Sequence, residues 1–135
     1  MNVKKEIDGF ILNRLQGALL NEAMRLYSDG YASSDEIDAT IRDGLGLRWA
    51  FMGPFETIDL NAPGGIKDYI SRYGPIFVEM AKNQTKIPDW SEEAGKKLEL
   101  ERRKILGHEE LEDRAKKRNQ LLKTLRKVKI DNGEV

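Results

Sequence analysis

Residues 9–30 read GFILNRLQGALLNEAMRLYSDG. Apolar side chains recur in this stretch every three or four residues, namely Phe10, Ile11, Leu15, Ala18, Leu19, Ala23, Leu26 and Tyr27. This spacing predicts one largely buried helix from residue 9 to about residue 28, and Gly30 is a suitable stop for it. The first element is therefore expected to be a long core helix.

Short signals downstream predict two further helices. Ser33-x-x-Glu36 fits a capping box, and the helix that follows is expected to turn Ile37 and Ile41 inward and to end at Gly44. Pro54 suits the first turn of a third, short helix. The packed side chains of that helix are expected to be Phe55, Ile58 and, less clearly, Leu60.

The next helical pattern begins at Ile66, after the turn sequence NAPGG. One face carries Ile66, Tyr69, Ile70, Tyr73, Phe77 and Met80, which are most simply core or subunit-interface residues. Pro75 lies inside this pattern and predicts a kink or a break after Tyr73.

A change of composition divides the chain near Pro88, which is expected to interrupt a helix before Ser91 caps the next one. Residues 1–88 hold 12 acidic and 10 basic side chains, whereas residues 89–135 hold 11 and 13 and are charged at 24 of 47 positions. We expect 1–88 to form an apolar core and 89–135 a charged tail of two amphipathic helices. No segment alternates like a strand, so the predicted fold is all-α with five to seven helices.

Composition excludes several classes of protein. The chain has 135 residues, 39% of them hydrophobic and 34% charged, with 23 basic and 23 acidic side chains and no cysteine. No signal peptide or membrane span is visible, so a cytoplasmic, membrane-free protein is expected. The basic segments from Glu101 to Lys127 are interrupted by glutamates and lack aromatic platforms, which disfavours nucleic-acid binding.

Familiar catalytic motifs are absent from the sequence. It contains no G-x-G-x-x-G, no P-loop and no H-E-x-x-H, and no metal site is predicted. The single histidine, His108, lies among charges near a predicted helix start, where a solvated position is expected.

Asn13 stands in an otherwise apolar part of the first helix. Burial without hydrogen-bonding partners would cost this amide about 1–3 kcal/mol. It is expected either to bond a neighbouring loop or lie exposed beside Arg14, or to direct its dipole at a polar ligand or another domain's catalytic group. The residues themselves slightly favour the structural interpretation.

Arg48 is the one charge in GLGLRWAFMGPF, residues 44–55. It is expected either to cap the carbonyl end of the first helix or pair with Glu56, or to bind a carboxylate or phosphate bidentately between Trp49 and Phe51. The surrounding glycines would then frame a loop that presents it. The two interpretations have equal weight on the residues alone.

Residues 8–65 resemble the C-terminal helical domain of the 3-hydroxyacyl-CoA dehydrogenase family. The matching motifs are G-F-[IV]-x-N-R-L at residues 9–15, Glu22-Ala23, the S-x-x-[DE]-I-D segment that ends at Asp38, and M-G-P-F-E at 52–56. Within that family, GLRWAFMGPFETIDLNAPGG resembles the lambda-crystallin branch, which includes L-gulonate 3-dehydrogenase, with carnitine dehydrogenase as a near relative. Residues 89–135 resemble this branch more loosely.

The resemblance implies that this chain corresponds to one of the two domains of an oxidoreductase. In the family, an N-terminal Rossmann domain binds NAD and carries the catalytic histidine, while a helical domain like that of 6-phosphogluconate dehydrogenase closes the substrate cleft and dimerises. Asn13 matches the family's catalytic-site asparagine, and Arg48 matches the branch's arginine for the anionic end of the substrate. The implied substrate is a 3-hydroxyacyl-CoA thioester of fatty-acid metabolism or a small 3-hydroxy acid.

The missing Rossmann half leaves the role of the isolated chain open. We expect no cofactor on this chain and no activity from it alone, with NAD bound by a Rossmann partner in cis or in trans. A stand-alone, non-catalytic helical interaction module derived from the same domain is the alternative.

Overall fold

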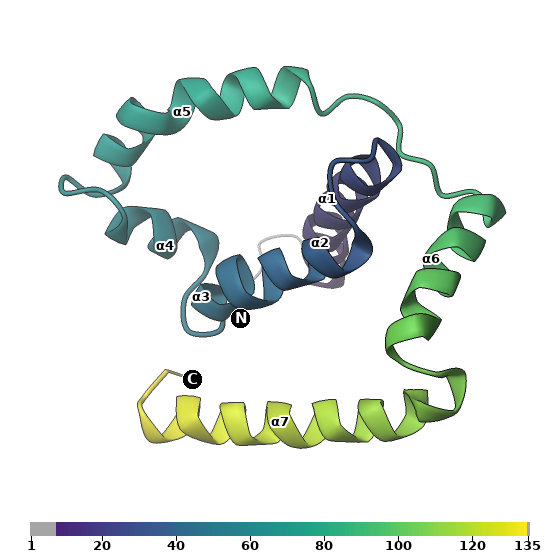
Figure 1. The fold of residues 1–135 in the computed structure, drawn as a ribbon. Coiled ribbons are helices and arrows are strands. Elements are labelled where there is room, and N and C mark those ends of the chain that lie inside the picture. Colours follow the sequence, from purple (N-terminus) through teal and green to yellow (C-terminus); the bar gives the residue numbers. More distant parts are fainter. Residues whose placement is uncertain (1–7, 135) are drawn as a thin grey trace.

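A computed structural model describes residues 8–134, which contain seven α-helices, one π-helical turn and one 3-10 turn, and no strand (Figure 1). This confirms the predicted all-α class and helix number, although residues 1–7 of the expected core segment lie outside the described part. The elements are α1 Asp8–Ser28, α2 Ser34–Thr40, η1 Ile41–Leu45, α3 Gly46–Trp49, α4 Pro54–Leu60, α5 Ile66–Lys82, α6 Glu92–Ile105, η2 His108–Glu110 and α7 Leu111–Asp131.

Helix α1 ends as its sequence predicts. Gly30 has φ +79°, and its N–H donates to the Tyr27 carbonyl at 3.1 Å. The Tyr31 N–H donates to the Leu26 carbonyl at 3.0 Å, which completes a Schellman motif. Glycine adopts this left-handed conformation without the steric cost that a Cβ atom brings.

The predicted helix starts are also confirmed. The Ser33 hydroxyl accepts from the Glu36 N–H at 3.1 Å while the Glu36 carboxylate accepts from the Ser33 N–H at 2.9 Å, a complete capping box. Pro54 occupies the first turn of α4. The Ser91 hydroxyl accepts from the Ala94 N–H at 3.3 Å and caps α6.

One predicted helix end is wrong. The chain does not leave the helix at Gly44, because η1 and α3 carry helical structure on to Trp49. Of the kink or break expected after Tyr73, the break is not found, because α5 continues through Pro75 to Lys82. A glycine or a proline weakens a helix by removing side-chain restraint or one hydrogen bond, and neighbouring turns can tolerate that loss.

The expected burial of α1 and α4 is wrong for most of their apolar residues, although Tyr27 is buried and Ile58 is half-buried. Exposed fractions reach 59% for Phe10, 63% for Leu15, 75% for Phe55 and 65% for Leu60. The residues buried within the described chain are Met24, Tyr27, Ser34, Thr57, Ala62 and Ala94. These few residues are too small a core to cover the apolar helix faces, so the faces stay open to solvent.

Helix α6 is attached to α1 and α2 by one polar cluster. The Tyr27 hydroxyl donates to one oxygen of Glu101, and the Ser34 hydroxyl donates to the other at 3.1 Å. The Lys97 ammonium lies 5.0 Å from the centre of the Tyr27 ring. This Tyr27–Ser34–Glu101 cluster fixes the position of the tail helix α6 against the front half of the chain.

The linker between α5 and α6 is held along α1. Arg25 donates to the Lys86 carbonyl at 2.6 Å, and Trp90 donates to Asn21 at 2.9 Å. Gln84 donates to Glu22 at 3.1 Å. The chain therefore passes from α5 back across α1 before it enters α6 (Figure 1).

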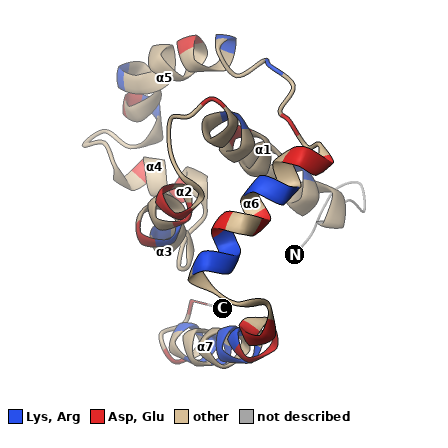
Figure 2. Ribbon diagram, turned by 45° about the vertical axis from the view of Figure 1, so that its right-hand side comes forward, with Lys and Arg blue, Asp and Glu red and all other residues tan. Residues whose placement is uncertain are grey.

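Helices α5 and α7 lie at opposite ends of the molecule, and Lys and Arg recur along α7 (Figure 2). Residues 114–129 contain eight basic residues and no acidic one, so the glutamates that interrupt the basic segments all precede Arg114. His108 lies exposed in η2, just before α7, as predicted.

Candidate functional site

Asn13 lies in the second turn of α1, and its side chain is exposed. The side-chain amide of Asn13 forms no hydrogen bond with any other residue in the range 8–134, so the expected bond to a neighbouring loop is not found. Leu12 next to it is 66% exposed, and Phe10 and Leu15 are similarly open. Asn13 is thus exposed, as one of its structural interpretations expected, on a part of α1 whose surrounding apolar side chains the described chain leaves uncovered.

Arg48 lies in α3, one helical turn between η1 and residue 50, so the predicted glycine-framed loop is wrong at this point. The side chain is exposed, and its neighbours Trp49 and Phe51 are 37% and 40% exposed. The helical backbone restricts the direction of Arg48 more tightly than a loop would.

The structural roles considered for Arg48 are not observed among the described residues. It makes no ion pair with Glu56 there. The last carbonyls of α1, including that of Leu26, accept backbone N–H groups from residues 29–31 and need no arginine. The guanidinium can therefore offer its donors to an anion from outside the described chain.

The π-helical turn η1 determines where Arg48 lies. The Gly46 N–H donates to the Ile41 carbonyl five residues earlier, instead of four as in an α-helix. A Cβ atom on Gly46 would lie 2.7 Å from the Ile41 carbonyl oxygen, closer than real Cβ contacts allow. Gly46 is therefore needed for close approach of the backbone, two residues before Arg48.

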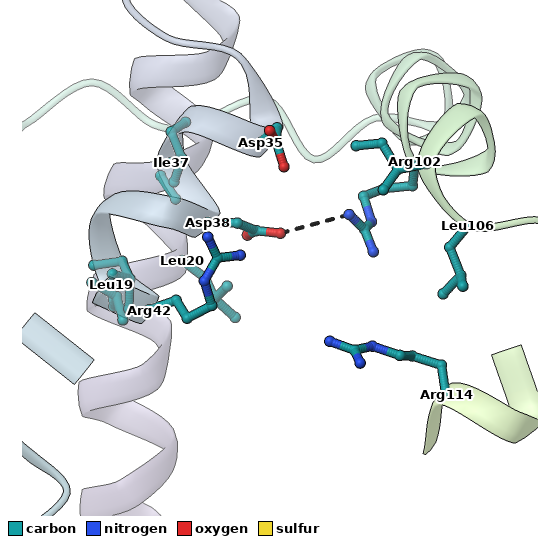
Figure 3. Close-up of a pocket in the computed structure, with 12 residues that line it drawn as sticks. Leu19, Leu20, Asp35, Ile37, Asp38, Arg42, Arg102, Leu106 and Arg114 are labelled. Atoms are coloured by element: carbon teal, nitrogen blue, oxygen red, sulfur yellow. Dashed lines mark ion pairs between the residues drawn. The ribbon is translucent and has the colours of Figure 1, made fainter. Parts of the chain in front are cut away.

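A hollow of about 730 Å³ lies between α1, α2, α6 and α7 (Figure 3). Arginines from three elements reach it, and Arg102 forms an ion pair with Asp38 across 3.8 Å. The lining consists of Leu19, Leu20, Ala23, Asp35, Ile37, Asp38, Ile41, Arg42, Arg102, Ile105, Leu106 and Arg114. Neither Asn13 nor Arg48 is among these residues, and no hydrogen bond or ion pair joins those two in the described chain.

Sequence reasoning missed this hollow. Its walls come from segments more than 60 residues apart, and no local pattern indicates that Asp38 and Arg102 meet. Arg42 at its edge is paired with Asp43 by contacts of 3.0 and 2.9 Å. That hydrogen-bonded pair raises the pKa of Arg42 and lowers the pKa of Asp43, so both are charged at neutral pH.

Neither a metal site nor an NAD site is visible in the described part of the chain. No three residues there with side chains suited to a metal lie close enough together to hold an ion. The strand-turn-helix unit that cradles a dinucleotide is absent from residues 8–134, and the sequence has no G-x-G-x-x-G. The residues present therefore do not fit NAD. No helix among those described could cross a membrane.

Comparison with known proteins identifies a family. Residues 9–108 match the model of the 3-hydroxyacyl-CoA dehydrogenase C-terminal domain. Lambda-crystallin of Oryctolagus cuniculus is 40% identical over 131 residues, which cover 96% of this chain and 41% of the rabbit protein. L-carnitine dehydrogenase of Oceanobacillus iheyensis is 38% identical over 131 residues, which cover 90% of this chain and 40% of that protein. A human lambda-crystallin homolog is 41% identical over 98 residues, 73% of this chain and 30% of the homolog.

The chain spans about two fifths of the length of the rabbit and Oceanobacillus relatives. The match therefore describes one part of a longer architecture. It agrees with the lambda-crystallin-like branch that residues 46–65 resemble.

Proposed function

Because this chain belongs to the 3-hydroxyacyl-CoA dehydrogenase family, as its C-terminal domain, we propose that it forms the substrate side of an NAD-dependent 3-hydroxy acid dehydrogenase. Residues 1–88 are the core of this domain and residues 89–135 its charged helical tail. A Rossmann domain, on the same polypeptide or a separate one, supplies the NAD site. The observation that carries the proposal is that Asn13 is exposed on a part of α1 whose apolar side chains the described chain leaves uncovered.

The exposed apolar side chains at the start of α1 are suited to docking another domain. Phe10, Leu12 and Leu15 are each more than half exposed, and burying a side chain of this size yields about 1.5–3 kcal/mol. A docked Rossmann domain would bring Asn13 into a water-poor cleft, where its amide acts more strongly than in solvent. Asn13 would then hydrogen-bond beside the catalytic histidine and the substrate oxygen as the C3 hydroxyl is oxidised to a ketone.

Arg48 would hold the anionic end of the substrate. It has no partner among the described residues, and its planar guanidinium can donate two parallel hydrogen bonds to a carboxylate. This chemistry favours a small free 3-hydroxy acid, while a coenzyme A thioester would offer its phosphates instead. L-carnitine and L-gulonate both carry a carboxylate and a C3 hydroxyl and are suitable probes.

The test of Arg48 uses the complete enzyme, meaning this chain joined to or mixed with its nucleotide-binding domain. Arg48→Ala is expected to raise KM for the free acid about 10–100-fold, because a charge-assisted hydrogen-bonded pair is lost. Arg42→Ala is the matched control, since Arg42 is exposed nearby but already paired with Asp43. An Arg48→Ala enzyme with the KM of the control would refute the anion-binding role.

The test of Asn13 measures turnover in the same enzyme. Asn13→Ala is expected to lower kcat about 100-fold with a smaller change in KM, because the amide acts on charge that develops during the reaction. Gln16→Ala, one turn further along α1 and also exposed, is the control. Equal kcat values in the two variants would remove Asn13 from the site.

A non-catalytic interaction module remains the alternative function, since exposed apolar helix faces also suit binding to another protein. It predicts that neither Asn13→Ala nor Arg48→Ala changes any dehydrogenase activity, while apolar-to-charged substitutions on α1 abolish partner binding. Measuring both sets of variants separates the two functions.

A further inference from the structure

The π-helical turn η1 widens the helix between α2 and α3 by one residue. The Gly46 N–H reaches the Ile41 carbonyl, so five residues separate donor and acceptor where an α-helix has four. Such turns arise as one-residue insertions and are frequent at functional sites. Arg48 follows the last residue of this turn, Leu45, by three residues.

Gly46 is the residue that makes the turn possible. A Cβ atom there would meet the Ile41 carbonyl oxygen at 2.7 Å, and this is a backbone atom that cannot rotate away as a flexible side chain would. The backbone φ of Gly46 is −62°, an ordinary helical value, so the requirement is for space alone. Gly44, in the same turn, has no atom within 4 Å of its virtual Cβ and offers a matched control.

The element before η1 is anchored to another helix. Ser34, at the start of α2, donates to Glu101, and Asp38 pairs with Arg102, both on α6. Because α2 is held in this way, a change of helical register at Gly46 would move the segment after it, which carries Arg48.

The size of that change follows from helix geometry. Each residue of an α-helix turns the chain by about 100° and advances it by about 1.5 Å. If the π turn closed to an α turn without loss of a residue, the Arg48 side chain would rotate by about 100° around the helix axis. A guanidinium aimed at a carboxylate would then point away from it.

We propose that Gly46 is a positioning residue, and that the π turn it permits sets the direction in which Arg48 meets the carboxylate of the substrate. The inference rests on the proposed function of Arg48. Gly46 touches no substrate in this account and acts through the backbone alone.

The first test compares two glycine variants in the complete enzyme, with L-carnitine or L-gulonate as the free acid. Gly46→Ala is expected to raise KM for the acid at least about tenfold while KM for NAD stays unchanged, and Gly44→Ala is expected to leave both unchanged. In an Arg48→Ala background, Gly46→Ala should add nothing, because both changes remove the same contact. Equal KM values for the two glycine variants, or effects that multiply in the double variant, would overturn the proposal.

A rescue experiment keeps the proposal testable if Gly46→Ala misfolds. Deleting Gly44 places Gly46 four residues after Ile41, so the same hydrogen bond becomes an α-helical one while residues after it keep their direction. The deletion combined with Gly46→Ala is expected to fold, by circular dichroism, and to restore KM to within about threefold of the unmodified enzyme. A raised KM in this folded double variant would contradict the inference. Failure of Arg48→Ala to raise KM would instead refute the proposed function itself.

Discussion

Tyr27 joins helices that are far apart in the sequence. Its ring is buried, and its hydroxyl donates to Glu101, 74 residues away. Burial, together with the Glu101 hydrogen bond and charge, raises the pKa of Tyr27 to about 12. The hydrogen bond from Tyr27 in turn lowers the pKa of Glu101, so the neutral phenol and the charged carboxylate are the forms that stabilise the fold.

This coupling predicts a pH dependence of stability. A raised folded-state pKa means that the contribution of Tyr27 is complete below its ordinary pKa of 10.0 and is lost as the pH rises toward 12. The free energy of unfolding, measured in urea, should therefore fall more steeply above pH 10 in the unmodified chain than in Tyr27→Phe.

At neutral pH, Tyr27→Phe is expected to lower Tm by about 5 °C, because the Glu101 hydrogen bond is lost. Tyr31→Phe is the control, since Tyr31 is 78% exposed. Identical pH profiles for the Tyr27→Phe chain and the unmodified chain would contradict this assignment.

Among the features of the helices, the sequence best predicts those starts and ends whose signals are local. Ser33, Gly30 and Pro54 each act through atoms within five residues, and each has the predicted role. The continuation of the helix past Gly44 depends instead on the Gly46 N–H, which donates to the Ile41 carbonyl five residues earlier. A glycine in the sequence permits this bond but does not predict it. The sequence therefore predicts a loop at Arg48, whereas this residue lies in α3.

Two glycine-to-alanine substitutions are expected to change the free energy of unfolding in opposite directions, because the backbone conformation differs at the two positions. Gly30→Ala is expected to lower the free energy of unfolding by about 1 kcal/mol, because φ is +79° there although no atom lies within 4 Å. Gly95→Ala, in the exposed interior of α6, is expected to raise it by about 0.5–1 kcal/mol. Urea unfolding of both variants measures the pair, and effects of the same sign would show that backbone conformation does not control these positions.

Burial could not be predicted from periodicity. The apolar spacing of α1 correctly predicts a helix with a face to cover, yet Phe10 and Leu15 are exposed in the described chain. Apolar periodicity shows that a helix has an apolar face to be covered. It does not show whether the same chain or another one covers that face. The open faces on α1 and α5 agree with a chain that spans only about two fifths of its relatives.

The aromatic stripe of α5 is the best candidate for a subunit interface. Tyr69 stacks near Phe77 with ring centres 6.3 Å apart, and Phe77 is 50% exposed, which makes a role inside the core of the described chain untenable. We expect the chain to form dimers, and Phe77→Asp to raise the dimer dissociation constant at least about tenfold because a desolvated aromatic contact is lost. Sedimentation velocity measures this. Ile87→Asp, in the α5–α6 linker and 88% exposed, is the control, and equal dissociation constants would exclude this face.

For the molecule as a whole, we propose that this chain provides the substrate side of a dehydrogenase whose NAD site lies elsewhere. The most direct measurement is the rate of NAD reduction with L-carnitine or L-gulonate by the nucleotide-binding domain, with and without this chain. We expect reduction only when the chain is present, with KM raised about 10–100-fold when it carries Arg48→Ala. Equal rates with and without the folded chain would contradict this role.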